Sequence, residues 1–283
     1  MVTSPVLVRP DSAPLAGSPR TQLINGGPSG NVTGSPISVD LVHLPPGHVD
    51  EPHHHTDTWV YLLVWHAGPL GAIIRHGPAR SEITPSTDQL VAIPPGVTYT
   101  LRNPSNEHDI LAYEFRATTT VAVAFPTNAT PTLIRTDHHE FALSQQGQPM
   151  ATLLDGGPDG NVPGSPVSAG LVRMRPGHVA EPHHHGNTWI YVLVRHAGSL
   201  GAVTLHGPTL EGRIHQRVGQ LVAMPPKKAH AAVNPSDQDD IVAYEFRANP
   251  TIHTDNIILN ELRPALDDQK PVLFSPSMTT RAR

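Results

Sequence analysis

Short apolar runs, each closed by a turn signal, follow one another along most of this chain. The segments TWVYLLV (58–64) and TWIYVLV (188–194) are rich in β-branched and aromatic residues, and QLVAIPP and QLVAMPP stop at paired prolines. The segments DILAYEFR and DIVAYEFR alternate between apolar and polar positions, which is the period of a strand with one buried face. Clusters of Gly, Pro, Asn and Asp separate these runs at intervals of roughly 8–12 residues, which predicts a β-sandwich or a β-barrel.

Helical patterns are rare in the sequence. Only residues 137–145 and 257–268 carry a pattern that a helix could use. The 283 residues include 31 prolines and 23 glycines, a composition that favours short strands and turns over long helices. The predicted fold class is therefore all-β.

The strand pattern occurs twice. Residues 26–117 repeat as residues 156–248, from GGPSGNVTGSP against GGPDGNVPGSP to NPSNEHDILAYEFRA against NPSDQDDIVAYEFRA. The offset is 130 residues at first and 131 after an insertion near Val218. A period this long indicates a duplicated domain and not a solenoid. We expect a flexible tail at residues 1–22, one domain at 23–148, a second at 149–268 and a loose tail at 269–283.

The composition narrows the choice of partners and of metal ligands. The net charge is −5, so no basic field is present to attract nucleic acid or an anionic membrane, and a small molecule is the expected partner. Cysteine is absent, which excludes thiolate ligands and leaves nitrogen and oxygen donors for any metal. No apolar run approaches the roughly 18 residues of a membrane helix, and the N-terminus lacks an apolar segment of secretory length. A cytoplasmic location is the default expectation.

Histidine clusters are the strongest chemical signal. The sequence EPHHH occurs at Glu51–His55 and at Glu181–His185, inside PGHVDEPHHHTDTWVYLLV and PGHVAEPHHHGNTWIYVLV. Imidazole is the commonest protein ligand for first-row transition metals. Residues i and i+2 of a strand share a face, so the outer histidines of each triplet can project into a barrel while the middle one points away.

These residues resemble the two motifs of the cupin superfamily, G-x5-H-x-H-x3,4-E-x6-G and G-x5-P-x-G-x2-H-x3-N. The duplication further resembles a bicupin, which has two tandem jelly-roll (double-stranded β-helix) barrels. The resemblance implies that His230, from a separate strand, completes a metal site with His183 and His185. The matching positions are Gly177, His183, His185, Gly219, Pro225, His230 and Asn234 in the second repeat, and Gly47, His53, His55, Pro94, Gly96 and Asn103 in the first.

Two departures from these motifs affect the predicted site. The motif glutamate is absent: Trp59 or Val60 occupies its place in the first repeat, and Trp189 or Ile190 in the second. In addition, Tyr99 replaces the second-motif histidine of the first repeat. We therefore expect an all-histidine working site in the second repeat and a degenerate or weakly metallated one in the first.

The resemblance thus assigns ligands and neighbours by position. The predicted metal ligands are His183, His185 and His230 in the second barrel and, more weakly, His53, His55 and Tyr99 in the first. His48 and His178, which also repeat, are candidates for partners of the ligands or for an extra ligand. Glu114 and Glu245, within the repeated AYEFRA, are expected to pair with an arginine such as Arg116 or Arg247.

Three functions stay open at this point. Sites of three histidines occur in cupin thiol, diketone and gentisate dioxygenases, so the resemblance implies first an Fe(II) oxygenase acting on a small organic molecule. Zn(II), Ni(II) and Mn(II) are alternative metals. The pattern is also similar to the zinc-dependent cupin polyketide cyclases, in which the metal polarises a carbonyl. The third alternative is a non-catalytic bicupin that binds a small ligand. By analogy with other bicupins we expect a monomer or a homodimer.

Overall fold

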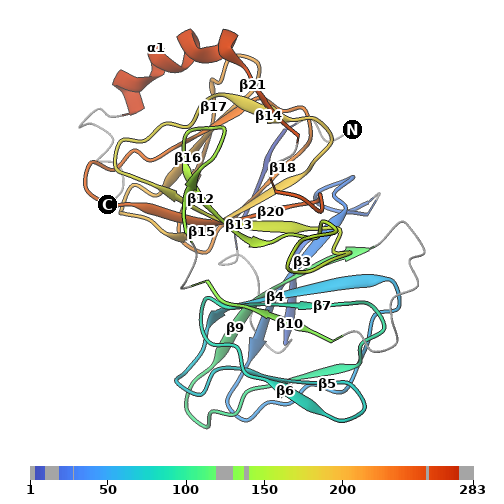
Figure 1. The fold of residues 1–283 in the computed structure, drawn as a ribbon. Coiled ribbons are helices and arrows are strands. Elements are labelled where there is room, and N and C mark those ends of the chain that lie inside the picture. Colours follow the sequence, from blue (N-terminus) through green and yellow to red (C-terminus); the bar gives the residue numbers. More distant parts are fainter. Residues whose placement is uncertain are drawn as a thin grey trace. The chain divides into compact units, whose positions relative to one another are not determined.

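The computed structural model describes residues 4–9, 19–27, 29–118, 130–136, 140–252 and 255–273 of the chain, and nearly every regular element in them is a strand (Figure 1). The chain divides into two compact units, one for each repeat. We call the unit of Pro10–His138 and Leu154–Pro166 the first barrel, and the unit of Met1–Arg9, His139–Leu153 and Val167–Arg283 the second barrel. The predicted all-β class is confirmed.

The first barrel consists of two antiparallel sheets. The larger sheet has the order β10 (Thr132–Ile134), β7 (Leu90–Ile93), β4 (Thr58–His66), β9 (Ile110–Thr118), β3 (Ile37–Leu44) and β2 (Arg20–Ile24). The smaller sheet has the order β6 (Ser81–Ile83), β5 (Ile73–His76) and β8 (Tyr99–Arg102).

The second barrel has the same two-sheet arrangement, with more strands in each sheet. Its larger sheet has the order β1 (Val6–Val8), β18 (Leu221–Met224), β15 (Ile190–His196), β20 (Ile241–Arg247), β13 (Ser168–Met174), β12 (Pro149–Leu154) and β11 (Ala142–Leu143). The smaller sheet has the order β17 (Gly212–Gln216), β16 (Ala202–His206), β19 (His230–Val233), β14 (His183–His185) and β21 (Asn256–Ile258).

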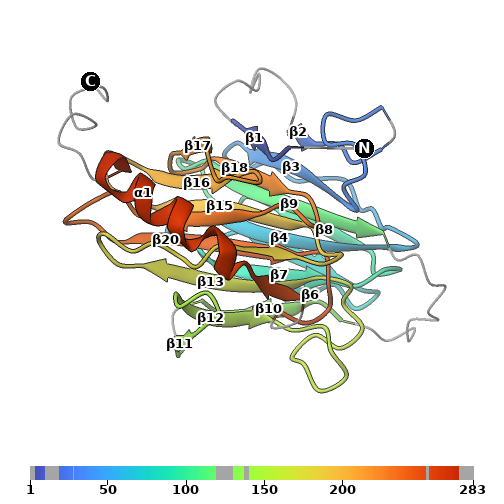
Figure 2. The ribbon, with the colours of Figure 1, turned by 90° about the horizontal axis from the view of Figure 1, so that it is seen from above.

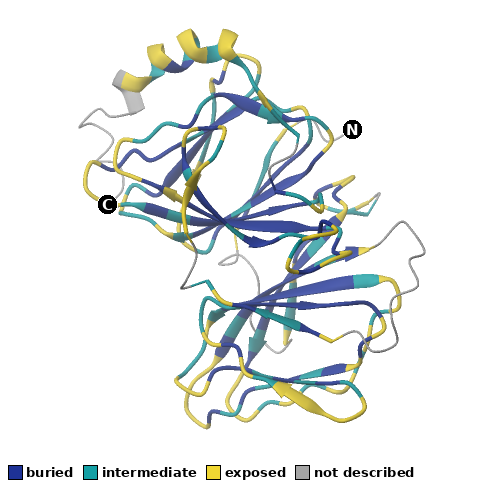
Figure 3. Ribbon diagram, in the orientation of Figure 1, coloured by how far each residue is buried: buried dark blue, intermediate teal, exposed yellow. Residues whose placement is uncertain are grey.

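Buried residues lie along the strands of both barrels (Figure 3), and many of them are apolar side chains that pack together, which explains the sequence pattern. In the first barrel, Val60 and Leu62 of β4 pack in one buried cluster with Ile74 of β5 and Leu101 of β8. In the second, Ile190, Val222 and Met224 form a buried cluster against which the partly buried Ile214 of β17 packs. Residues directly opposite these on neighbouring strands share the inward face.

The few helical residues lie near the C-terminus. The 3₁₀ turn η2 (Asn260–Leu262) leads into α1 (Arg263–Leu273), and Leu262 and Leu266 pack on a cluster from β16 and β19 (Figures 1 and 2). The helix predicted at 257–268 is thus partly correct, because residues up to Ile258 pair as β21 with β14. No helix in the described ranges is long and apolar enough to cross a membrane.

The helix suggested at residues 137–145 is wrong over its described part. Residues 140–145 form no helix, because Ala142 and Leu143 pair with Met150 and Pro149 as the edge hairpin β11–β12. Gly147, with a φ of +76°, supplies the left-handed residue that this turn needs. Residues 137–139 lie outside the described ranges.

The predicted tails also differ from what the structure contains. Residues 6–8, within the expected flexible tail 1–22, form β1 and pair with β18 of the second barrel, while Leu7 packs on its buried apolar cluster. Strand β2 already begins at Arg20. At the other end, α1 continues to Leu273, inside the expected loose tail. Three apolar residues are enough for an edge strand, but the surrounding Pro, Ser and Ala conceal them in the sequence.

Candidate metal centre

Three histidines of the second barrel come from two adjacent strands. His183 and His185 lie on β14, and His230 begins β19, directly opposite His183 in the antiparallel register. Directly opposed residues point to the same face, and so do residues i and i+2 of one strand. The exposed fractions are 5% for His183, 2% for His185 and 7% for His230, whereas the intervening His184 is only partly buried. The expected alternation within the histidine triplet is thus what the strand shows.

The three imidazole rings converge. The ring centroid of His183 lies 5.1 Å from that of His185 and 4.3 Å from that of His230, and the last two are 5.3 Å apart. One ring nitrogen of each histidine lies within 4.8 Å of those of the other two. Nitrogens bound to one ion at about 2.1 Å are at most about 4.2 Å apart, so small ring rotations bring these three to ligand spacing. Among the described residues, this is the group of His, Cys, Asp or Glu that converges in this way.

Backbone carbonyls orient two of the rings. The Nδ1 of His183 is 2.8 Å from the carbonyl oxygen of Glu181, and the Nδ1 of His230 is 2.8 Å from that of Lys228. Because a carbonyl only accepts, each Nδ1 carries the proton and donates it, which leaves the lone pair on Nε2. Such a hydrogen bond is how proteins fix the tautomer of a metal-ligating histidine. The Nδ1 of His185 is buried and has no hydrogen-bond partner.

Electrostatics keep the cluster neutral. Burial, reinforced by the neighbouring His230, lowers the pKa of His183 well below its usual value of 6.5. Burial, with His230 and His183 beside it, also lowers the pKa of His185. Burial likewise lowers the pKa of His230, against the weaker opposing effect of its bond to the Lys228 carbonyl. Neutral imidazole is the form that binds a metal, so this site is prepared for one at neutral pH.

The motif glutamate has no substitute at its own position. Trp189 is buried with its ring 6.3 Å from that of Tyr191, and Ile190 belongs to the interior apolar cluster. The donor set is therefore three neutral nitrogens. Imidazole donors suit zinc, iron, nickel and copper, so the residues fit a transition metal without selecting which one.

The first barrel has the same register with one different residue. His53 lies opposite Tyr99 in an isolated bridge, as His183 lies opposite His230, and the Nδ1 of His53 is 2.9 Å from the Glu51 carbonyl oxygen. The Tyr99 ring is 4.4 Å from the ring of His53 and 6.4 Å from that of His55. The Tyr99 hydroxyl is buried without a hydrogen-bond partner, and burial raises the pKa of Tyr99, so the phenol is neutral. His53 and His55 are also more exposed than their counterparts.

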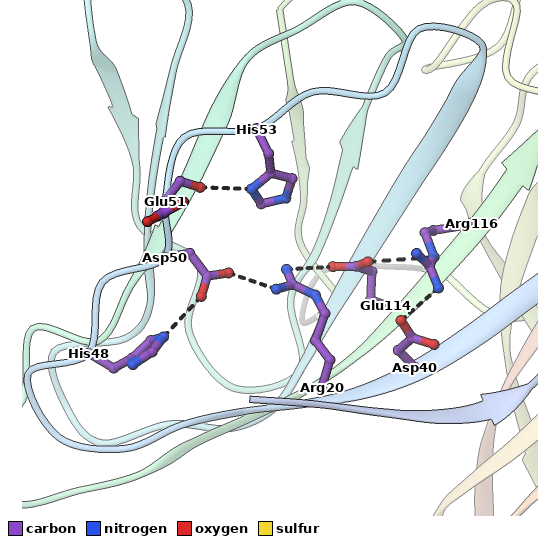
Figure 4. A network of polar contacts seen from close by, with 8 residues as sticks. All are labelled: Arg20, Asp40, His48, Asp50, Glu51, His53, Glu114 and Arg116. Carbon is purple, nitrogen blue, oxygen red and sulfur yellow. Dashed lines mark hydrogen bonds and ion pairs between the residues drawn. The ribbon is translucent and has the colours of Figure 1, made fainter. Parts of the chain in front are cut away.

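A network of ion pairs lies beside the histidines of the first barrel (Figure 4). Arg20 bonds to Asp50 at 2.9 Å and to Glu114 at 3.2 Å. Arg116 contacts Asp40 at 2.6 Å and Glu114 at 3.7 Å, so the predicted pairing of Glu114 with an arginine is confirmed. Glu114 lies opposite Leu62, and Arg116 opposite Val60, which places both on the inward face. Three carboxylates and two guanidiniums thus form one connected network of ion pairs within this barrel.

The second barrel keeps one ion pair at the equivalent positions. Nε and one terminal nitrogen of Arg247 each lie 2.6 Å from the same oxygen of Glu245, which confirms the predicted pair. The other terminal nitrogen donates to the Asn256 side-chain oxygen at 3.2 Å. Glu245 and Arg247 lie opposite Val192 and Ile190, so they too face inward.

His48 and His178, the matched histidines that precede the two triplets, lie apart from the three-histidine group. The Nε2 of His48 is 2.9 Å from an oxygen of Asp50 and so belongs to the ionic network of the first barrel. The Nε2 of His178 is buried with no partner, because Ala180 occupies the position equivalent to Asp50. Burial lowers the pKa of His178. Neither residue joins the converging cluster.

The motif asparagine is a structural residue. The Asn234 side-chain amide donates to the carbonyl oxygens of Met174, Arg175 and Asp239, and Asn103 bonds likewise to Leu44 and His108. In the second barrel these bonds connect the end of β19, which begins at His230, to the residues just before Gly177, where the first motif starts. The sequence motif therefore combines ligands with the loop contacts that hold them.

The architecture of this chain is similar to that of several solved structures. The chain superposes on the putative glyoxylate induced protein from Pseudomonas aeruginosa with a TM-score of 0.64 at 13% identity, over 87% of this chain and 88% of that one. It superposes on oxalate decarboxylase from Lactobacillus farciminis with a TM-score of 0.60 at 12% identity, over 92% and 90%. These are cupins with two domains. The chain has the bicupin fold.

The bicupin fold by itself leaves the function open. A vicilin from Solanum melongena matches as well as the decarboxylase does, with a TM-score of 0.61 at 12% identity over 87% of this chain and 84% of that one. No family model matches this sequence, and no curated protein matches it either.

Proposed function

We propose that this bicupin is a metal-dependent enzyme that acts on a small organic molecule in its second barrel. The observation that carries the proposal is the buried group of His183, His185 and His230, with two rings held by carbonyls and all three kept neutral. A solvated histidine cluster would need none of these features. In the described residues the first barrel has no such group.

These three histidines would hold one divalent ion through their free ring nitrogens. We propose Fe(II) first, since it would supply oxygenation chemistry at the positions that three ligands leave open. Neutral ligands leave the charge of the ion uncompensated, so an anionic, chelating substrate fits the site. The buried apolar side chains of Ile190, Val222 and Met224 would exclude water around it.

A redox-neutral zinc enzyme is the second candidate. The observation that favours it is the donor set of His183, His185 and His230, because three neutral imidazoles suit zinc as well as iron. Zinc held by histidines polarises carbonyl groups without oxygen, as in the cyclases that the motif resembles. In either case we propose that His53, His55 and Tyr99 bind metal weakly or not at all, since a neutral phenol is a poor ligand.

Metal analysis combined with oxygen uptake separates these candidates. The protein is purified without a histidine tag, and its metals are measured by mass spectrometry beside those of His183→Ala, His230→Ala and the matched first-barrel variant His53→Ala. Iron with oxygen consumption on a diketone or catechol-like substrate supports the oxygenase, and zinc with oxygen-independent turnover supports the second candidate. Equal metal content in wild type and in His183→Ala would refute both.

A further inference from the structure

Among the described residues, the second barrel has one ion pair at the positions where the first barrel has a network of five charged residues. Of the five charged positions that form the network of the first barrel, the second repeat keeps two and replaces three by apolar or small residues. The replacements are Met150 for Arg20, Gly170 for Asp40 and Ala180 for Asp50, and the retained pair is Glu245 for Glu114 and Arg247 for Arg116.

Stability alone does not account for the retained pair. Buried ion pairs are often replaced by apolar side chains of similar volume at no cost in stability. The same chain has apolar side chains at the neighbouring positions: a Cβ on Gly170 would lie 2.6 Å from the terminal methyl groups of both Met150 and Ile252, which therefore occupy the space that the Asp40 carboxylate takes in the first barrel. Yet the side chain at position 247 is an arginine that is only 2% exposed. A buried arginine at a position whose neighbours are apolar points to a role in binding a ligand.

The guanidinium of Arg247 is only partly used by the protein. A guanidinium has five N–H donors, and Glu245 and Asn256 accept from three of them. Ser168 lies directly opposite Arg247 in the β13–β20 register, and therefore on the same face. Its hydroxyl is fully buried and has no hydrogen-bond partner. Two unused N–H groups and one unused hydroxyl thus face the interior together.

These donors lie close to the three histidines. Asn256, which binds Arg247, is the direct register partner of His185 in β14–β21. The positive charge of Arg247 also contributes to the lowered pKa of His183, His185 and His230. A planar guanidinium matches a carboxylate through paired N–H···O bonds, and a carboxylate is also the charge that a metal on neutral ligands lacks.

We infer that Arg247 and Ser168 form a carboxylate-binding subsite beside the three-histidine group, so that the substrate is a small carboxylic acid. This inference rests on the proposed function for its metal, but its donors are defined by the protein alone. Glu245 and Asn256 are positioning residues, because they accept hydrogen bonds from the guanidinium and hold it in place on the face that it shares with Ser168.

The test is calorimetric titration of the zinc-loaded full-length protein with malonate and benzoate, and with malonamide and benzamide as uncharged controls. We expect one acid per chain to bind and neither amide to bind. Arg247→Lys keeps a charge for Glu245 but loses the planar donors, so affinity falls at least about tenfold. Ser168→Ala lowers affinity about threefold, the effect of one neutral hydrogen bond. The matched first-barrel variant Arg116→Lys leaves affinity unchanged.

Several results would overturn the subsite. These are failure of both acids to bind, or unchanged acid affinity in Arg247→Lys. If Arg247→Lys does not fold, Ser168→Ala decides, since it removes a hydroxyl without a protein partner, and unchanged affinity there refutes the inference. Metal content is measured separately. If wild type binds no metal, the proposed function fails, and the same titrations of the metal-free protein still decide whether Arg247 and Ser168 bind the acid.

Discussion

The two barrels place equivalent positions in the same register, but different residue types occupy those positions. His53 is the register partner of Tyr99 in the first barrel, and His183 is the register partner of His230 in the second, at equivalent positions of the two repeats. The first barrel surrounds its histidines with a five-residue ionic network, while the second removes most of that charge and buries neutral imidazoles. The fold therefore supplies the same positions in both barrels, and a few substitutions change the donor atoms at those positions.

The largest expected effect comes from making the second barrel resemble the first. His230→Tyr should weaken zinc binding more than about 100-fold, because it removes a ligand and adds a neutral phenol. This loss exceeds the roughly 10–100-fold that follows from mutating a residue that only hydrogen-bonds to a ligand. Competition with a chelator of known affinity measures this. His53→Ala is the matched control and should leave the affinity unchanged. Equal losses in both variants would mean that the barrels are equivalent.

The reverse substitution sharpens the comparison. Tyr99→His completes a His-x-His plus His set in the first barrel at the register position of His230. We expect the variant to bind a second zinc ion per chain, more weakly than the first, because His53 and His55 are more exposed and Arg20 and Arg116 lie nearby. Metal stoichiometry after gel filtration reports it. A stoichiometry that stays at one would show that the first barrel lacks more than a ligand.

The buried ion pair of the second barrel gives the next largest effect. Glu245→Leu leaves the Arg247 charge buried without its partner and should cost about 3–5 kcal/mol of unfolding free energy. The double variant Glu245→Leu/Arg247→Met should recover most of that loss, since no charge is left unpaired. Denaturant unfolding measures both. As a control, the exposed Arg75–Glu82 pair should contribute under about 1 kcal/mol when Glu82 becomes Ala. A double variant as unstable as the single one would refute this interpretation.

The smallest expected effect is the change in stability of the metal-free protein with each unit of pH. The pKa values of His183, His185 and His230 lie below 6.5 in the folded state, so the unfolded chain binds more protons as the pH falls. Stability is complete above pH 6.5 and declines below it, by at most about 1.4 kcal/mol per pH unit for each histidine. The triple alanine variant should flatten this slope. Unchanged stability of the metal-free wild type down to pH 5 would contradict the burial of the cluster.

The sequence predicted the fold and the convergence of three histidines because both depend on local pattern. Strand alternation fixed which histidines of EPHHH share a face, and the long repeat located His230 relative to them. It did not reveal β1, since a three-residue edge strand has no period of its own and its partner is more than 200 positions away. It paired Glu245 with Arg247 but did not link them to the site. The link between this ion pair and the histidines runs through Asn256, which lies outside the repeated segments.

Anomalous diffraction from crystals of the wild-type protein, with metal content measured on the same sample, tests the central claim most directly. We predict one transition-metal ion per chain, bound by His183, His185 and His230, and no ion between His53, His55 and Tyr99. An ion of similar occupancy in both barrels, an ion in the first barrel alone, or a protein that holds no metal after gentle purification would contradict the assignment of the chemistry to the second barrel.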